Sequence, residues 1–369
     1  MRSPLIESQN SHAGKQNNLN LIFEIIQIDD PVNTGKNGKY LRIRDINKVF
    51  YDIDIKEYQD KYAVALQERN PIDIVPTVSD SDETIQNDDR IKSETFDSHN
   101  NSELLTYLFS KINIDANQLS DLSDITITTD LPEILELPWE QIFDVNSVVY
   151  RKYFKNEVVN RGSNWDSNDL VILMSHAHEG LGYDLTEVMN QEIRSIYDTL
   201  HYLRDNNLQS FRIDNILLSK HTTRNSIGKL DWKSYNYVHF ISHGTPNGDL
   251  ALEKDDKERY KYPDTITKGE LLNILNSYSF NLVFLSICFS GGGTKDEDSI
   301  AYQLVKNGIT NYCIGYRGYV GEETANNFTK LFYEQLTLGG NISETFKKSY
   351  KTFRSENKKI KYIPYLYMS

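Results

Sequence analysis

The chain has 369 residues, of which 38% are hydrophobic and 11% aromatic, so it is long enough to bury a large core and to form two domains. Its formal net charge of −13 argues against nucleic acid as the main ligand, because a phosphate backbone is bound by clustered Lys and Arg. No apolar run approaches the roughly 20 residues that a membrane helix needs, so we expect a globular protein without a membrane span.

The first 18 residues are polar and rich in Asn, Ser and Gln, which predicts a disordered arm. They lack the apolar segment of a signal peptide. Cys288 and Cys313 both lie in apolar runs typical of strands, which indicates thiols in a reducing compartment rather than a disulfide framework. We therefore expect a cytoplasmic protein.

Residues 19–78 contain three short β-rich segments, LNLIFEIIQI, KYLRIRDI and VFYDIDI, which predict a small antiparallel N-terminal domain. This region carries no evident chemistry and is interpreted as a packing or partner-binding unit. Residues 79–103 are acidic and poor in large apolar side chains, so they predict a linker. If the chain is a protease, this segment is alternatively a site at which it cleaves itself.

The next segment begins with LLTYLFSKI, which has the pattern of an amphipathic helix, and continues into DITITT, which alternates as a strand does. An LPWE element follows at Leu137 to Glu140. We interpret Trp139 as a core anchor and Glu140 as a buried hydrogen-bond partner rather than as catalytic groups.

From Asp169 onwards, apolar runs alternate with helical patterns, which predicts an α/β fold with a mostly parallel sheet flanked by helices. The expected strands are LVILMS, FRIDNILL, YVHFIS, LVFLSI and YCIGY. The expected helices comprise LTEVMNQEIRSIYDTLHYL and residues 267–276, 298–307, 322–337 and 342–354.

Two of these strands end in reactive side chains, His243 after YVHFIS and Cys288 after LVFLSI. Consecutive parallel strands deliver such residues to the same edge of a sheet. A cysteine thiol is mostly protonated at neutral pH, so a neighbouring imidazole is its usual activator. We interpret His239, inside its strand, as a core histidine and Cys313 as a small buried hydrophobe.

The blocks YVHFISHG, LVFLSICFSGG and LPWE resemble those of the CHAT family of caspase-like cysteine peptidases of bacteria. The resemblance covers residues 104–369 and implies a caspase-like fold there. It implies that His243 is the general base, that Cys288 is the nucleophile, and that the amides of Gly244 and Cys288 form the oxyanion hole. Neither a metal nor an organic cofactor is needed in this chemistry.

The same resemblance implies an endopeptidase that makes limited cuts in a protein substrate, in antiviral defence or cell death. A gasdermin-like pore-forming protein is one such substrate. Family members are commonly held inactive until triggered, and we take the N-terminal domain as the candidate binding module for an activating partner.

Acidic residues after the cysteine, Asp296, Glu297 and Asp298, could place a carboxylate in the primary pocket and select a basic cleavage-site residue. Alternatively, they favour the start of the helix near Ser299. The sequence leaves both interpretations open.

Further cleft residues are expected after two strands. Tyr316, Arg317 and Tyr319 follow the last predicted strand, and Arg317 could instead read an acidic substrate side chain. His176 and His178 follow the first, where they line the cleft, orient the base or belong to a plain loop.

Two other function classes compete with the peptidase. One is a catalytically silent scaffold that uses the caspase fold to bind proteins, although intact His243, Gly244 and Cys288 weigh against it. The other is acyl transfer through the same nucleophile.

Overall fold

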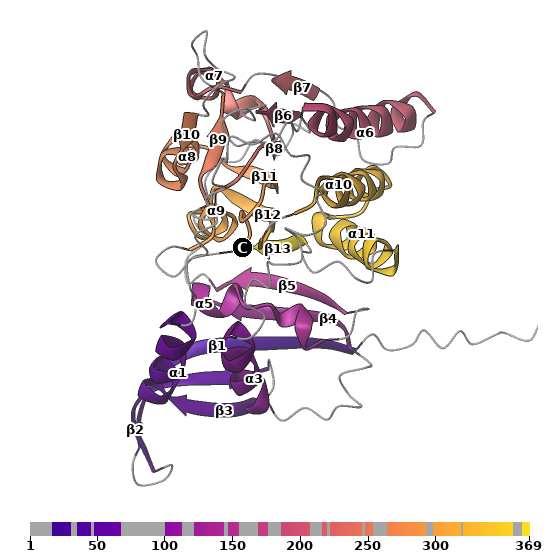
Figure 1. Cartoon of the computed structure of the whole chain (residues 1–369). Coiled ribbons are helices and arrows are strands. Elements are labelled where there is room, and N and C mark those ends of the chain that lie inside the picture. Colours follow the sequence, from indigo (N-terminus) through magenta and orange to yellow (C-terminus); the bar gives the residue numbers. More distant parts are fainter. Residues whose placement is uncertain are drawn as a thin grey trace, which may run out of the picture.

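The computed structural model describes residues 17–30, 35–45, 48–67, 100–112, 122–143, 147–154, 169–175, 186–206, 216–219, 222–245, 248–253, 264–292, 298–318, 320–356 and 364–369. Within these residues, eleven strands form one sheet in the order β3-β2-β1-β4-β5-β13-β12-β11-β8-β6-β7, and β9 and β10 form a separate pair. The sheet runs through the whole length of the molecule (Figure 1).

The N-terminal half of the sheet mixes antiparallel and parallel pairs. β1 pairs antiparallel with β2 and parallel with β4, and β4 pairs parallel with β5. The elements here are β1 (Asn17–Asp30), β2 (Lys36–Arg44), β3 (Val49–Asp54), α1 (Ile55–Gln67), α3 (Asn100–Ser110), β4 (Leu122–Thr129), α5 (Pro132–Leu135) and β5 (Val148–Tyr153).

The C-terminal half has the alternating α/β pattern. Its elements are β6 (Leu170–Met174), α6 (Thr186–Asp205), β7 (Ile216–Ser219), α7 (Arg224–Lys229), β8 (Tyr237–Ile241), β9 (Leu250–Leu252), β10 (Asp264–Ile266), α8 (Lys268–Leu275), β11 (Phe280–Ser286), α9 (Ile300–Lys306), β12 (Thr310–Tyr316), α10 (Glu322–Thr337), α11 (Ile342–Glu356) and β13 (Pro364–Met368). Short 3-10 turns add Trp139–Gln141 and Trp232–Ser234.

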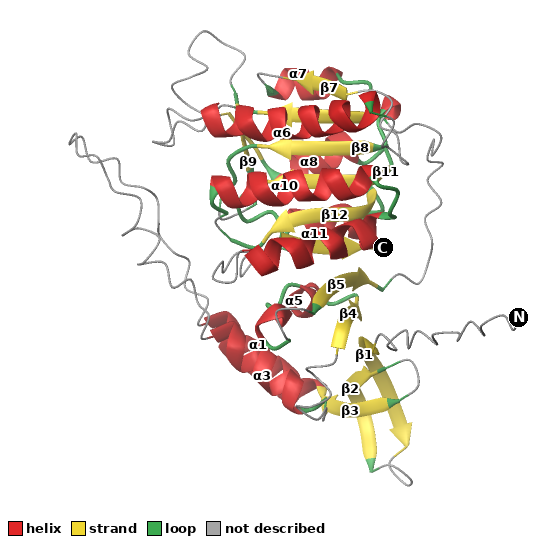
Figure 2. Ribbon diagram, turned by 90° about the vertical axis from the view of Figure 1, so that its right-hand side faces the viewer, coloured by secondary structure: helices red, strands yellow, loops and turns green. Residues whose placement is uncertain are grey.

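Helices cover both faces of this half. Helices α6, α10 and α11 lie along one face and α7, α8 and α9 along the other (Figure 1), and Figure 2 shows the strands stacked behind α6, α10 and α11. The predicted fold class, an α/β fold with a mostly parallel sheet flanked by helices, is confirmed. Among the helices of the described ranges, none is both long and apolar enough to cross a membrane.

Several elements were not predicted. Helix α1 follows β3 inside the region expected to be β-rich, and strands β5, β9, β10 and β13 add to those expected. β13 lies antiparallel to β12 and parallel to β5, and it thereby joins the two halves of the sheet. β13 pairs with strands that are distant in the sequence, and β5 pairs with the preceding β4 as well as with the distant β13, so local patterns carry little information about these pairings.

The domain division remains a prediction. The expected arm, residues 1–18, falls outside the described residues except for 17 and 18, and so does the expected linker except for residues 100–103, which begin α3. β1 pairs with β4, so residues of the expected N-terminal domain share one sheet with residues 122–129.

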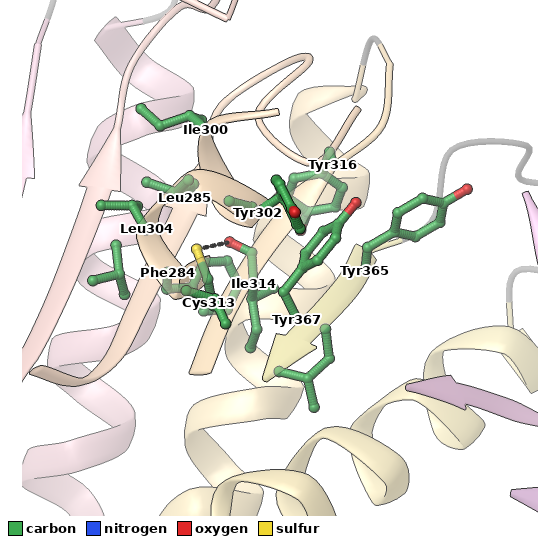
Figure 3. Packing of buried hydrophobic residues seen from close by; sticks show 14 of the residues in the cluster. Phe284, Leu285, Ile300, Tyr302, Leu304, Cys313, Ile314, Tyr316, Tyr365 and Tyr367 are labelled. Carbon is green, nitrogen blue, oxygen red and sulfur yellow. Dashed lines mark hydrogen bonds between the residues drawn. The ribbon is translucent and has the colours of Figure 1, made fainter. Parts of the chain in front are cut away.

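The core beside β11 and β12 is rich in aromatic rings. Tyr316 of β12 and Tyr365 and Tyr367 of β13 (Figure 3) are all buried. On the face covered by α10, Phe284 packs against Phe332 with ring centroids 5.5 Å apart. These contacts fix the strands that carry the candidate site.

Candidate active site

His243 and Cys288 lie at the same edge of the sheet because their strands are neighbours. β8 and β11 are parallel, and their register pairs Ile241 with Ser286. Each reactive residue follows its strand's last paired residue by two positions. The prediction that the two strands are adjacent is therefore confirmed, and the strands end level with each other.

The turns after the strands are in contact at Gly244. A Cβ atom added there would clash with the carbonyl oxygen of Cys288 and would lie 2.6 Å from Cγ2 of Ile287. A side chain at this position would push the two turns apart, so the close approach requires glycine. The residue after the candidate base thus packs directly on the backbone of the candidate nucleophile.

The β9–β10 pair holds the turn that carries His243. The amide of Ala251 in β9 donates to the carbonyl oxygen of His243 at 3.0 Å. The Ser242 hydroxyl lies 2.8 Å from that same oxygen and 3.0 Å from the carbonyl oxygen of Ala251. These contacts fix the backbone of the candidate base from the side away from Cys288's strand.

The turn that carries Cys288 has a constrained backbone. Phe289 has a φ of +60°, which among the described non-glycine residues is the single positive value. An L-residue in this left-handed region is strained, and such strain gathers at functional sites. The Phe289 amide donates to the carbonyl oxygen of Gly318 at 3.1 Å, and Gly291 donates to that of Tyr316 at 2.8 Å. The end of β12 therefore holds the turn in place.

The sulfur of Cys288 contacts the backbone before α10. The amide nitrogen of Val320 donates to the sulfur across 3.4 Å, and the sulfur lies 3.9 Å from the carbonyl oxygen of Val320. The side chain is half-buried, and an N–H donor stabilises a thiolate.

Cys313, in contrast, is fully buried in β12, where its sulfur lies 4.0 Å from the carbonyl oxygen of Ile314 (Figure 3). Burial raises the pKa of its thiol well above the ordinary value. It is a small buried hydrophobe, as predicted.

The predicted specificity residues occupy different surroundings. Tyr316 is fully buried, and burial raises its pKa, with smaller contributions from the charges of Glu192 and Cys288. Arg317 is half-exposed, and its positive charge lowers the pKa of Tyr365 against the larger, opposite effect of burial. The Cγ of Arg317 would lie 2.8 Å from a Cβ on Gly292, so this side chain lies against the glycine loop after Cys288.

Asp298 points along helix α9. Its carboxylate accepts a hydrogen bond from Nε2 of Gln303 at 2.6 Å and lies 3.9 Å from Nζ of Lys306. The backbone oxygen of Asp298 accepts from Nζ of Lys268 at 2.5 Å. This is the arrangement expected if the residue supports the start of the helix. The other predicted groups, His176, His178, Asp296, Glu297 and Tyr319, lie outside the described residues.

The LPWE element is anchored in the core beside β5. Nε1 of Trp139 donates to the carbonyl oxygen of Ile134 at 2.8 Å, and the ring is fully buried. Glu140 accepts from both terminal nitrogens of the buried Arg151, at 2.6 and 2.8 Å. The interpretation of Trp139 as core anchor and Glu140 as buried hydrogen-bond partner is confirmed.

Glu136, just before that element, was not predicted to matter. Its carboxylate accepts from the amide of Ser299 at 2.7 Å, and Ser299 is the N-cap of α9. The sequence signal for it is weak, because the two residues are far apart along the chain. This bond connects the loop of the LPWE element to the segment that follows the glycine loop.

A CHAT domain model matches residues 104–365, which is most of the chain. The chain belongs to the CHAT domain family. The family resemblance expected from the sequence blocks is thereby confirmed. A comparison with curated proteins gave no match.

Solved structures that match the chain include two cysteine proteases. A secreted C11 cysteine protease from Bacteroides thetaiotaomicron, bound to an irreversible peptide inhibitor, is 10% identical with a TM-score of 0.35, and the match covers 52% of this chain and 60% of that one. The Arg-specific cysteine proteinase gingipain R is 9% identical with a TM-score of 0.43, over 75% and 68%. The Saccharomyces cerevisiae separase–securin complex is 12% identical with a TM-score of 0.36, over 85% and 22%.

Proposed function

We propose that this CHAT protein is a cysteine endopeptidase in which Cys288 is the nucleophile and His243 the general base. The observation that carries the proposal is the contact of Gly244 with the backbone of Cys288, which leaves no room for a side chain between the two turns. The register of β8 and β11 supports the proposal further, because these adjacent parallel strands end at paired residues. Membership of the CHAT family agrees with this chemistry.

In the proposed reaction, His243 takes the proton of the Cys288 thiol, and the resulting thiolate attacks the scissile carbonyl and forms a carbon–sulfur bond. The amides of Gly244 and Cys288 donate to the resulting oxyanion. His243 gives its proton to the leaving amine as the carbon–nitrogen bond breaks, and an acyl-enzyme remains. Water then attacks with His243 as base, the carbon–sulfur bond breaks, and the thiolate returns. Donation from the Val320 amide to the sulfur favours that thiolate.

The substrate in this proposal is a protein that is cut at few positions, in bacterial antiviral defence or cell death. A gasdermin-like pore-forming protein is the candidate target. The N-terminal strands are the candidate binding surface for an activating partner. Support for this role comes from the family resemblance, and from the sheet that joins β1 through β4 and β5 to β13, beside the strands of the site.

Two charged groups are candidates for selecting the substrate residue at the cleavage site. The carboxylate of Asp298 is engaged by Gln303 and Lys306, whereas Arg317 lies against the glycine loop after Cys288. Fluorogenic peptides ending in Arg, Leu or Asp distinguish a basic from an acidic cleavage-site preference, and R317A should specifically slow the Asp peptide if Arg317 reads the substrate.

Single substitutions at the dyad test the activity itself. C288A should abolish cleavage and labelling by a peptidyl chloromethyl ketone, and H243A should lower the rate by about 10²-fold or more while the protein stays folded. C313A is the matched control, because it removes a buried thiol outside the site and should retain cleavage and labelling. Cleavage or labelling that survives in C288A would refute the proposal.

A further inference from the structure

A buried carboxylate contacts the two strands that carry the dyad, on the face of the sheet covered by α6 and α10. Glu192 of α6 is 4% exposed. Its Oε2 accepts a hydrogen bond from the hydroxyl of Ser286 at 3.0 Å, and its Oε1 accepts one from the hydroxyl of Thr329 at 2.7 Å. The same Oε1 lies 3.3 Å from Nε2 of His239.

Two of these partners belong to the strands that carry the dyad. Ser286 is the last residue of β11, two positions before Cys288, and His239 lies in β8, four positions before His243. One carboxylate therefore contacts both strands at once. Any shift of one strand against the other would stretch one of these contacts.

His239 is itself held on two further sides. Its Nδ1 lies 3.0 Å from the hydroxyl of Tyr333 in α10, and its ring stacks on Phe284 with centroids 4.5 Å apart. Phe284 is also its direct neighbour in the register of β8 and β11. The contact of Nε2 with Glu192 has the distance of an ion pair without the alignment of a hydrogen bond. Because His239 contacts Glu192 and belongs to β8, a displacement of the Glu192 carboxylate would also displace β8.

Packing alone does not account for this carboxylate. Glu192 lies on the same helical face as the buried Met189, Ile193 and Ile196, where an apolar side chain would be the ordinary choice. Burying a carboxylate costs free energy that its partners only offset, and buried ion pairs are often no more stabilising than apolar residues of similar size. Its directed bonds, in contrast, specify geometry in a way that apolar contacts do not.

We propose that Glu192 is a positioning residue that fixes β8 relative to β11 and thereby sets the geometry of His243 and Cys288. The inference rests on the proposed function, because it assumes that the two residues act as a dyad. A misplacement of about 1 Å between reacting groups can cost about 10²-fold in rate, so a rigid tie between their strands has a measurable effect.

A matched pair of variants separates positioning from mere stability. S286A and T329V each remove one hydroxyl donor to Glu192, but Ser286 lies on the strand of Cys288 whereas Thr329 lies on α10. The full-length chain is treated with iodoacetamide, and the rate constant for alkylation of Cys288 is followed by peptide mapping. Each variant is measured with His243 and in an H243A background, and thermal unfolding is recorded in parallel.

We expect S286A to lower the His243-dependent alkylation rate and kcat by about tenfold with little change in KM, and T329V to stay within about twofold at a similar loss of thermal stability. In the H243A background, S286A should have no further effect on alkylation. E192Q keeps the size of the side chain but replaces one acceptor oxygen with an NH2 donor, which one of the two hydroxyls can still accept. It should therefore fold and fall between S286A and the wild type.

The outcomes distinguish the two levels of the argument. A wild-type alkylation rate that does not depend on His243 would overturn both the dyad and the positioning role. A His243-dependent rate that S286A leaves unchanged, or that S286A and T329V lower equally, would overturn the positioning role alone. An effect on KM without one on kcat would do the same, because it would place Glu192 in substrate binding. His243-dependent alkylation that S286A lowers and T329V does not, without cleavage of any peptide or protein, would contradict the peptidase and leave the positioning role supported.

Discussion

Polar side chains have different surroundings in two regions of the sheet, the N-terminal end (β1, β2 and β3) and the strands of the candidate site (β8 and β11), which we call its centre. In β2, the buried Leu41 and Ile43 alternate with Arg42 and Arg44, which pair with acidic side chains on the other, half-exposed face. β8, in contrast, is buried along its full length, so its polar groups are enclosed. Charges at the N-terminal end keep much of their hydration, whereas those at the centre depend on their protein partners. The same kind of substitution should therefore have very different effects in these two regions.

β5 and β13 form the junction between these two regions, and Arg151 of β5 is its central side chain. The guanidinium is fully buried, pairs with Glu140 and lies 3.4 Å from the ring centroid of Tyr365 in β13. Burial alone would lower the pKa of Arg151, but the Glu140 carboxylate raises it above its ordinary value. The same surroundings raise the pKa of Tyr365 to about 12, with burial as the main cause. The junction thus resembles the centre of the sheet rather than its N-terminal end.

The largest effect is expected at Gly244, where the contact between the two turns leaves no space for a side chain. G244A places a Cβ against the carbonyl oxygen of Cys288 and against Ile287, so the two turns must separate. We expect cleavage to fall by about 10²-fold or more, since reacting groups tolerate little displacement. We also expect the free energy of unfolding to fall by about 1–3 kcal/mol from overpacking. Peptide cleavage and urea unfolding measure the two effects.

Gly269 provides the control for that substitution. It lies on the exposed side of α8, and a Cβ there meets no atom within 4 Å. G269A should therefore leave cleavage unchanged and stabilise the protein by up to about 1 kcal/mol, because Ala favours a helix over Gly. If G244A retains wild-type cleavage, the close approach of the two turns has no role in the reaction.

The second effect tests whether the junction behaves like the centre. R151M leaves Glu140 buried without its cationic partner, so we expect a loss of about 3–5 kcal/mol in the free energy of unfolding. The double variant E140Q/R151M removes the uncompensated charge and should recover part of that loss. Urea unfolding followed by circular dichroism measures both. A loss below about 1 kcal/mol in R151M would mean that the pair is solvated like a surface ion pair.

The sequence predicted the dyad more fully than the residues that hold it. His243 and Cys288 each follow a continuous apolar run, so strand ends and chemistry coincide in short stretches of sequence. Glu192 had a weaker local signal, a carboxylate on the apolar face of a helix with Met189 and Ile196 on either side. Its partners, however, come from other elements of the chain, and only the fold brings them together.

Strands show the same limit. β8 is fully buried, β11 is buried except at Asn281, and both give long apolar runs. In contrast, β9 and β10 have three residues each and give no clear pattern. β13 reads PYLYM and finds its place through pairing with β12 and β5, which are distant in the sequence. Non-local pairing of this kind decides strand formation more than local propensity does.

The smallest effect is expected at the N-terminal end. Arg42 donates to Asp52 through Nε at 2.8 Å and Nη2 at 3.2 Å, and Lys36 donates to the same carboxylate at 2.8 Å. Burial would raise the pKa of Asp52, but the bonds from Arg42 and Lys36 lower it below its ordinary value. The stabilisation is therefore fully present above the ordinary carboxyl pKa of about 3.9 and is lost as the pH falls through the lowered one.

R42M should lower the free energy of unfolding by about 1 kcal/mol or less at neutral pH, because the pair is partly solvated. The difference between R42M and the wild type should shrink as the pH falls below about 4, where protonation of Asp52 removes the ion pair from both proteins. Urea unfolding at several pH values measures this trend, and alkylation of Cys288 should stay at the wild-type rate throughout. A loss above about 2 kcal/mol in the free energy of unfolding, or slower alkylation of Cys288, would show that the N-terminal end is as tightly constrained as the centre. The contrast between these two regions would then be wrong.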